Sequence, residues 1–414
     1  MAKDEITSQN IDWLNGIAVF IDDAIDDETS NAYKLKQQID KKNIPVLTRS
    51  NLPDDFETFS SHIHSASFVI LDWKFSNISG EAVVAGVNIP EAVRKSNEGE
   101  IIDFIKKLLN NTYCPIFIFS DEVISEIKDS LDLAGITHTG DHPRIFITSK
   151  TELLDEKLFE KINDRLKENA IVYTLKTWEK AANIAKKKMF STLESKHVSW
   201  PTVLWKTYES DHTNQSQELS KILTNIFSNY LLSNCLFSSD YFDPNKASVS
   251  IEDIKDVLEA ERFMTIDNET PPSPGDLFEI LDGEKIFYLL NIRAQCNLLH
   301  ITSPDLYCIR GTILDENRII RNQQRNNDDD ILFFQGQLHG REDAIYIPFV
   351  HNRKIIEFDL KQMKIKKYDS SFKAKRIGRI LPPYITRIQQ IVSAYIIREG
   401  LPAIPNDILA TPEK

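Results

Sequence analysis

Four short stretches decide the fold of this 414-residue chain: 17-IAVFI-21, 67-SFVIL-71, 115-PIFIF-119 and 144-RIFIT-148. Each is rich in β-branched and aromatic residues, and the segments between them are long enough to hold helices. Runs of this kind are typical of parallel strands that are buried on both faces. The sequence therefore predicts an N-terminal α/β domain built on an open parallel sheet.

Polar residues follow these stretches at the point where each strand is expected to end. Asp22 and Asp23 follow the first stretch, Asp72 the second, Ser120 the third and Lys150 the fourth. The carboxyl ends of parallel strands share one edge of a sheet, where loops form the ligand crevice. We therefore expect these five side chains to converge on one candidate active site.

The chemistry of the five residues is typical of phosphoryl transfer. Three carboxylates in one place repel one another, by roughly 4 kcal/mol per close pair at an effective dielectric constant near 20. Mg²⁺, a hard cation that prefers oxygen ligands, is the expected cofactor. Lys150 and Ser120 supply a cation and a hydroxyl for phosphate oxygens, and Asp72 is the expected nucleophile. The alternative is structural, because aspartates after strands also cap helices.

With this set of residues, positions 15 to about 155 resemble the receiver domain of bacterial two-component response regulators. The resemblance rests on the acidic pair Asp22 and Asp23, the acceptor Asp72, Ser120 and Lys150, in that order. It implies a flavodoxin-like, doubly wound sheet and transfer of phosphate from a sensor histidine kinase onto Asp72. It also implies Mg²⁺ held by Asp22 or Asp23, Asp72 and a backbone carbonyl near Lys74. The sequence shows no P-loop, HExxH, GxSxG or kinase signature, so no catalysis beyond phosphoryl acceptance and autodephosphorylation is expected.

Two departures from the family concern the conformational response. The stretch 73–100 replaces the short turn that usually follows the acceptor, and we expect it to cover the site. Ile147 stands three residues before Lys150, where the family commonly has Tyr or Phe. The sequence thus predicts phosphate acceptance, with the long segment after Asp72 as the element that moves.

Three regions are expected: a receiver-like domain at 1–155, a helical connector at 156–267 and a β-rich domain with a closing helix at 268–414. The connector shows apolar residues at helical spacing, which is typical of a segment that packs on itself or on a second copy. The Asp282-Gly283 pair predicts a hairpin. Further strands are expected at the following runs: 331–336, 343–350, 354–360 and 364–368, before a helix at 380–398.

Composition limits the kinds of partner and the cellular location that we expect for this protein. The net charge of -13 disfavours a general nucleic-acid coat or an anionic membrane surface. The four cysteines are scattered, so neither a zinc site nor a disulfide framework is expected. No apolar run approaches the length of a membrane span, and the polar N-terminus lacks the pattern of a signal peptide. A cytoplasmic protein is expected.

The sequence leaves two classes of function open for the C-terminal part of the chain. In the first, the protein is a signalling acceptor whose C-terminal part binds an effector protein or a second copy. In the second, it is a receiver-controlled effector that acts on nucleic acid. Segment 361–379 holds eight Lys or Arg residues against one acid, Asp369, which fits either a nucleic-acid footprint or a solvated hairpin face. The receiver with its insertion also resembles those of bacterial phage-defence cascades such as Detocs, which implies a phosphate sink in antiviral defence.

Overall fold

The computed structural model describes residues 16–75, 91–138, 144–167, 169–210, 214–242, 249–298, 303–314, 339–341 and 343–398. In the helix that begins at residue 91, side chains are described from residue 98 onward. Contacts divide the chain into two units, one of residues 1–200 and 221–247, the other of residues 201–220 and 248–414. Each unit is described by itself. The predicted boundaries at 155 and 267 stay predictions.

The first unit contains a five-stranded, entirely parallel sheet in the order β2-β1-β3-β4-β5. Its strands are β1 (Ala18–Ile21), β2 (Val46–Arg49), β3 (Phe68–Leu71), β4 (Ile116–Ser120) and β5 (Ile145–Ser149). The four predicted stretches form β1, β3, β4 and β5, so the predicted α/β parallel sheet is confirmed. The edge strand β2 was not predicted, because its side chains alternate between half-buried and exposed and leave no apolar run.

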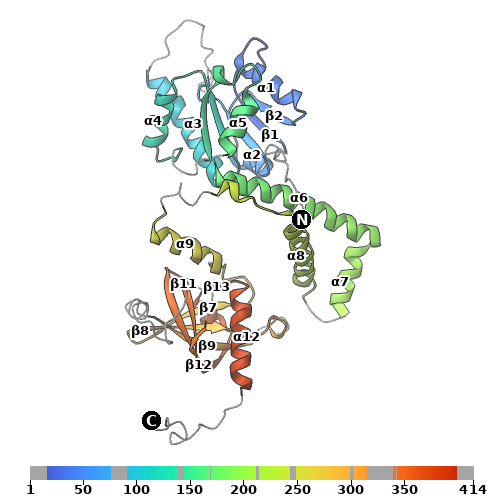
Figure 1. Cartoon of the computed structure of the whole chain (residues 1–414), viewed down its shortest axis with the longest axis vertical. Helices are drawn as coiled ribbons and strands as arrows, with labels where there is room; N and C mark the ends of the chain where they lie inside the picture. Colours follow the sequence, from blue (N-terminus) through green and yellow to red (C-terminus); the bar gives the residue numbers. More distant parts are fainter. Residues whose placement is uncertain are drawn as a thin grey trace, which may run out of the picture. The chain divides into compact units, whose positions relative to one another are not determined.

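Helices cover both faces of this sheet (Figure 1). On one face, Phe20, Ile70 and Phe117 pack against α1 (Asn31–Lys41) and α5 (Leu158–Lys167). On the other, alternate residues such as Ile21, Leu71 and Ile118 pack against helices from between the strands. These helices are α2 (Phe56–Ile63), α3 (Glu91–Asn111) and α4 (Ile124–Leu133). With two apolar faces, the sheet holds its strand ends in fixed positions.

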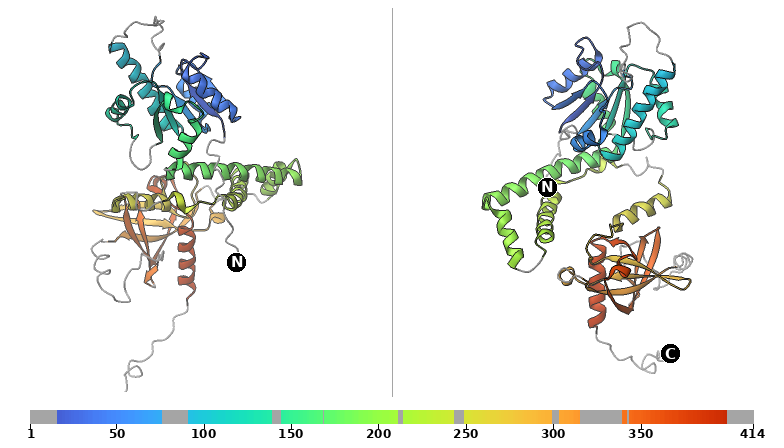
Figure 2. Two further views of the ribbon diagram at one scale, coloured as in Figure 1. Left: turned by 45° about the horizontal axis from the view of Figure 1, so that its top comes forward. Right: turned by 180° about the vertical axis from the view of Figure 1, so that it is seen from behind.

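A long helix, α6 (Ala170–Lys196), starts on the α/β body and extends beyond it (Figure 2). Its first turn adds Val172 and Tyr173 to the core, and Lys176 Nζ donates to the carbonyl of Ser67 at 2.5 Å, just before β3. Two further helices follow, α7 (Trp200–Ser210) and α8 (Gln215–Asn234). The helices predicted for this region are therefore present.

The second unit is built on an antiparallel sheet with the order β10-β11-β12-β9-β8-β7-β13-β6 among the described residues. The strands are β6 (Phe263–Met264), β7 (Asp276–Asp282), β8 (Lys285–Asn291), β9 (Asp305–Ile313), β10 (His339–Arg341), β11 (Ala344–Val350), β12 (Lys354–Lys367) and β13 (Arg376–Ile380). Helix α12 (Tyr384–Ile397) packs Ile385, Ile388 and Val392 on one face (Figure 1). The β-rich domain with its closing helix is thus observed.

Details of the C-terminal predictions differ from the structure. The Asp282-Gly283 turn does join β7 to β8, and the unit also contains the short helices α9 (Ile251–Arg262) and α11 (Ser370–Lys373). The two runs expected as separate strands at 354–360 and 364–368 form one strand, β12, with a change of register between Asp359 and Met363. Pairing to β9 continues on both sides of that irregularity, so the strand does not end there. The predicted strand at 331–336 lies outside the described residues.

Candidate functional site at the carboxyl edge of the parallel sheet

Strand register brings the predicted residues to one edge of the sheet. The amide of Asp22 donates to the carbonyl of Arg49 in β2, and the amide of Asp72 donates to that of Ile21 in β1, each at 2.9 Å. Ser120, the last residue of β4, pairs with Ser149, and Lys150 follows directly. Each functional side chain therefore stands just where its strand ends, as the sequence predicted.

Lys150 lies between two of the carboxylates. Its Nζ atom is 2.7 Å from Asp22 Oδ2 and 3.0 Å from Asp72 Oδ2. Asp23 completes the acidic group, because one carboxylate oxygen from each of Asp22, Asp23 and Asp72 lies within 4.8 Å of the others. Among the described residues, no other set of three His, Cys, Asp or Glu side chains comes so close together. The structure thus brings three carboxyl groups together with one ammonium group.

Backbone amides hold the acidic side chains in place. Asp22 Oδ1 accepts from the amide of Ala24 at 3.0 Å, and Asp72 Oδ1 accepts from the amide of Trp73 at 2.8 Å. The hydroxyl oxygen of Ser120, which is fully buried, accepts from the amide of Glu122 at 3.1 Å. These bonds fix one oxygen of each carboxylate and leave the other facing Lys150.

Burial shifts the protonation equilibria. Removal from water raises the pKa of Asp72 to about 7, although the charge of Lys150 opposes the shift. Burial also raises the pKa of Asp22, again against the effect of Lys150. For Lys150, burial lowers the pKa, but the charges of Asp72 and Asp22 and its bonds to them outweigh that effect and raise it overall. The site favours a charged lysine and a carboxylate that holds its proton to near neutrality.

The donor set fits a divalent cation with oxygen ligands. Asp22 Oδ2 is buried and contacts Lys150 Nζ at 2.7 Å. A buried carboxylate oxygen in that situation, next to two more carboxylates, is a suitable ligand for Mg²⁺. Asp22, Asp23 and Asp72 are the residues that could hold it.

Side-chain contacts at the rim of the site were not predicted from the sequence. Lys74 Nζ lies 2.6 Å from Glu122 Oε1, which joins the segment after β3 to the segment after β4. Asn31 Nδ2, at the start of α1, donates to Asp121 Oδ1 at 3.2 Å. Both acids directly follow Ser120, so they also stand at a strand end. Nothing in the sequence indicated which partners they would find.

Gln38 is a second omission. It is buried, its Nε2 donates to the carbonyl of Leu153 at 3.0 Å, and its Oε1 accepts from the amide of Leu158 at 3.3 Å. These bonds tie α1 to the chain that leaves the site after Lys150. Gln38 therefore helps to fix the position of the lysine, and only its place on the inner face of α1 could have indicated this.

Other predicted features lie elsewhere or are only partly described. The stretch 73–100 contains the start of α3 at Glu91, and residues 76–90 lie outside the described residues. Ile147 packs with the core, and its neighbour Phe146 stacks on Phe117 with the ring centroids 5.1 Å apart. No aromatic ring therefore occupies position 147, as the sequence indicated.

Comparison of the sequence with protein-family models and with curated proteins gives no match. No helix in the described part of the chain combines the length and apolar character needed to cross a membrane. The chemistry of the site is thus the main guide to function.

Proposed function

We propose that this chain is a phosphoacceptor signalling protein that takes a phosphoryl group from a histidine kinase onto Asp72. The observation that carries the proposal is the contact of Lys150 with Asp72 inside a group of three carboxylates, at one edge of a parallel sheet. The strand order β2-β1-β3-β4-β5 supports it, because flavodoxin-like receivers share the order 2-1-3-4-5 and bind their ligands at this edge.

In the proposed reaction, a carboxylate oxygen of Asp72 attacks the phosphorus of the phosphohistidine. The new oxygen–phosphorus bond forms as the nitrogen–phosphorus bond breaks, and the imidazole leaves and takes up a proton from solvent. Asp22, Asp23 and Asp72 would hold Mg²⁺, which offsets charge on the transferring phosphoryl oxygens when it is bound. Autodephosphorylation follows when water attacks the phosphorus, which releases phosphate and restores the carboxylate.

Lys150 and Ser120 have separate roles in this reaction. Lys150 Nζ, at 3.0 Å from the acceptor carboxylate, is within reach of a phosphoryl oxygen attached there. Ser120 Oγ accepts a bond from a backbone amide, so its own proton remains available to donate. A cation and a hydroxyl donor that are already in position stabilise the charge that develops during transfer.

The output is proposed to be contact with a partner protein or with a second copy through the helical region. No residue of α8 is buried, and apolar side chains near its end, Leu232 and Leu236, are 74% and 78% exposed. Apolar helix surface left in water favours association. A cytoplasmic location stays a prediction from composition, and a role as a phosphate sink in antiviral defence stays a prediction from the resemblance to receivers.

A small-molecule phosphodonor tests the acceptor function without the kinase. Acetyl phosphate with Mg²⁺ should shift the wild type on a phosphate-affinity gel, and Asp72→Asn should abolish the shift. Asp121→Asn, at the rim, is the matched control and should still be labelled. Labelling of Asp72→Asn equal to wild type would contradict the proposal.

A further inference from the structure

The basic segment 361–379 of the second unit divides into paired and unpaired cations. Lys361 lies 2.5 Å from Asp343, and Lys373 lies 3.0 Å from Glu269. Arg376 and Arg379 both bind the buried carboxylate of Asp276, at 3.1 and 2.6 Å. These four cations serve the fold, because each closes an ion pair. The segment therefore offers fewer unpaired positive charges than its composition suggests.

The lysines at the end of β12 are different. Lys364 and Lys366 are exposed, and neither forms an ion pair with any described residue. They lie two residues apart on one strand, so their side chains stand on the same face, about 7 Å apart. Lys366 is close enough to the buried Cys308 for its charge to lower the pKa of that thiol, against the larger effect of burial. Two uncompensated positive charges thus share this face.

Register places an arginine and an aromatic ring next to them. Lys364 pairs with Cys308, and Arg310 is two residues further along β9 on the same face. Arg310 pairs in turn with Leu289, two residues from Phe287 on β8. The guanidinium carbon of Arg310 lies 4.3 Å from the centroid of the Phe287 ring, and its Nε is buried without a hydrogen-bond partner among the described residues. The guanidinium of Arg310 is therefore held over the ring and forms no ion pair with a described carboxylate.

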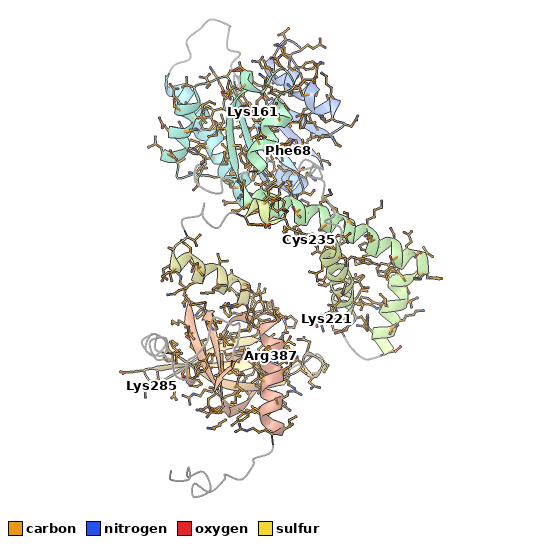
Figure 3. All side chains as sticks on the ribbon, viewed as in Figure 1. Phe68, Lys161, Lys221, Cys235, Lys285 and Arg387 are labelled. Carbon is orange, nitrogen blue, oxygen red and sulfur yellow. The ribbon has the colours of Figure 1, made fainter. Side chains whose placement is uncertain are left out.

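The row continues to Lys285, which is exposed at the turn between β7 and β8 and lies two residues before Phe287 (Figure 3). Each step along the row is a two-residue or diagonal neighbour distance of about 7 Å, so the row is about 28 Å long. We call these five residues the basic diagonal: Lys285, Phe287, Arg310, Lys364 and Lys366. Asp359, which is opposite Arg310 on β12, bounds it on one side and is bonded to Gln362 at 2.8 Å.

We propose that the basic diagonal binds single-stranded nucleic acid. Cations at regular spacing along a sheet suit a phosphodiester backbone, and the outer face of a guanidinium held over an aromatic ring offers a surface on which a base can stack. A strip one side chain wide suits a single strand better than the two backbones of a duplex. The net charge of -13 disfavours a general coat for nucleic acid, but a local row of cations acts over the Debye length of about 10 Å at 0.1 M salt.

Protection of an open strand edge is the structural alternative for the lysines. Described pairing of β12 with β11 runs only as far as Asp359, and lysines at such edges prevent strands of two molecules from joining. Charge reversal separates the two explanations. Lys364→Glu/Lys366→Glu keeps the edge charged and protected, but the new carboxylates repel phosphate.

The test measures fluorescence anisotropy of a labelled single-stranded oligothymidylate with the unphosphorylated full-length protein and no Mg²⁺. Wild type should bind with a salt dependence of about -3 in log K against log salt, for four cations at about -0.7 each. Lys364→Glu/Lys366→Glu should lose at least tenfold in affinity and reduce the slope to about -1.4. Lys186→Glu/Lys187→Glu, an equal change of charge at exposed positions on α6, should bind as wild type does.

Two further variants extend the test. Phe287→Leu should weaken binding several-fold with the salt slope unchanged, because stacking carries no charge. Asp72→Asn should bind as wild type does, so failure here is distinguishable from failure of the phosphoacceptor function. No binding by wild type, equal loss in the two charge-reversed variants, or tighter binding of a duplex of the same length would overturn the proposal, provided that thermal melting shows every variant to be folded.

Discussion

Lys150 Nζ lies 3.0 Å from Asp72 Oδ2, so the cation proposed to bind the phosphoryl group already contacts the carboxylate proposed to carry it. The same ammonium group lies 2.7 Å from Asp22. One lysine therefore compensates two buried carboxylates. Removing it should affect both stability and chemistry.

Replacing Lys150 with methionine should destabilise the first unit by about 3–5 kcal/mol at pH 8, because it leaves buried carboxylates without their cation. Urea unfolding followed by far-UV circular dichroism measures the change. Lys74→Met is the matched control, since it breaks the exposed pair with Glu122 and should cost at most about 1 kcal/mol. Equal effects of the two substitutions would show that the buried contact is unimportant.

The pH dependence of stability should carry the signature of Asp72. Its pKa is about 7 in the folded state, because of burial, and near 3.9 when unfolded, so the folded state binds the extra proton between these values. Stability without Mg²⁺ should therefore fall as the pH rises from about 4 to about 7. The decline contributed by this group is at most about 1.4 kcal/mol per pH unit.

Asp72→Asn should reduce that decline, since the amide has no proton to lose in this range. Asp22 should maintain part of it, because its pKa is also raised by burial. Denaturant midpoints from pH 4 to 8 in the presence of a chelator measure the difference. Parallel curves for wild type and variant would mean that Asp72 ionises in the folded protein as it does in water.

The central strands could be predicted because each is buried on both faces and therefore consists of apolar residues. Phe20, Ile70 and Phe117, for example, pack against one of the two layers of helices. The sequence also indicated the site, since residues that follow parallel strands must meet at one edge. It missed β2, whose Leu47 is 43% exposed at the sheet edge. Gln38 and Asn31 were missed because their partners lie more than eighty residues away, and no local pattern encodes such contacts.

The C-terminal unit was harder to predict for a related reason. The runs at 354–360 and 364–368 look separate because Lys361 and Gln362 interrupt the apolar pattern, yet the chain continues through a change of register as β12. Segment 361–379, which begins within β12, has eight basic residues, but Arg376 and Arg379 bind the buried carboxylate of Asp276. The sequence shows how many basic residues a segment has, but only the folded structure shows which of them form ion pairs.

Mg²⁺ should stabilise the first unit by filling the acidic group. At ten times its dissociation constant the ion should add about 1.4 kcal/mol to the free energy of unfolding. Thermal melting with and without Mg²⁺ measures this, and fluorescence of Trp73, buried beside Asp72, reports binding directly. Asp22→Asn/Asp23→Asn should remove both responses. Asp26→Asn/Asp27→Asn, in the acidic loop that follows, should keep them.

Identification of the phosphorylated residue tests the central claim most directly. Acetyl phosphate with Mg²⁺, followed by borohydride reduction, converts a phosphorylated aspartate to homoserine, which peptide mass spectrometry locates. The account predicts homoserine at position 72 alone, and much less of it in Lys150→Met, because the acceptor loses the cation that lies 3.0 Å away. Homoserine at position 22 or 23, or a stable phosphate on a serine or histidine with position 72 unmodified, would contradict it.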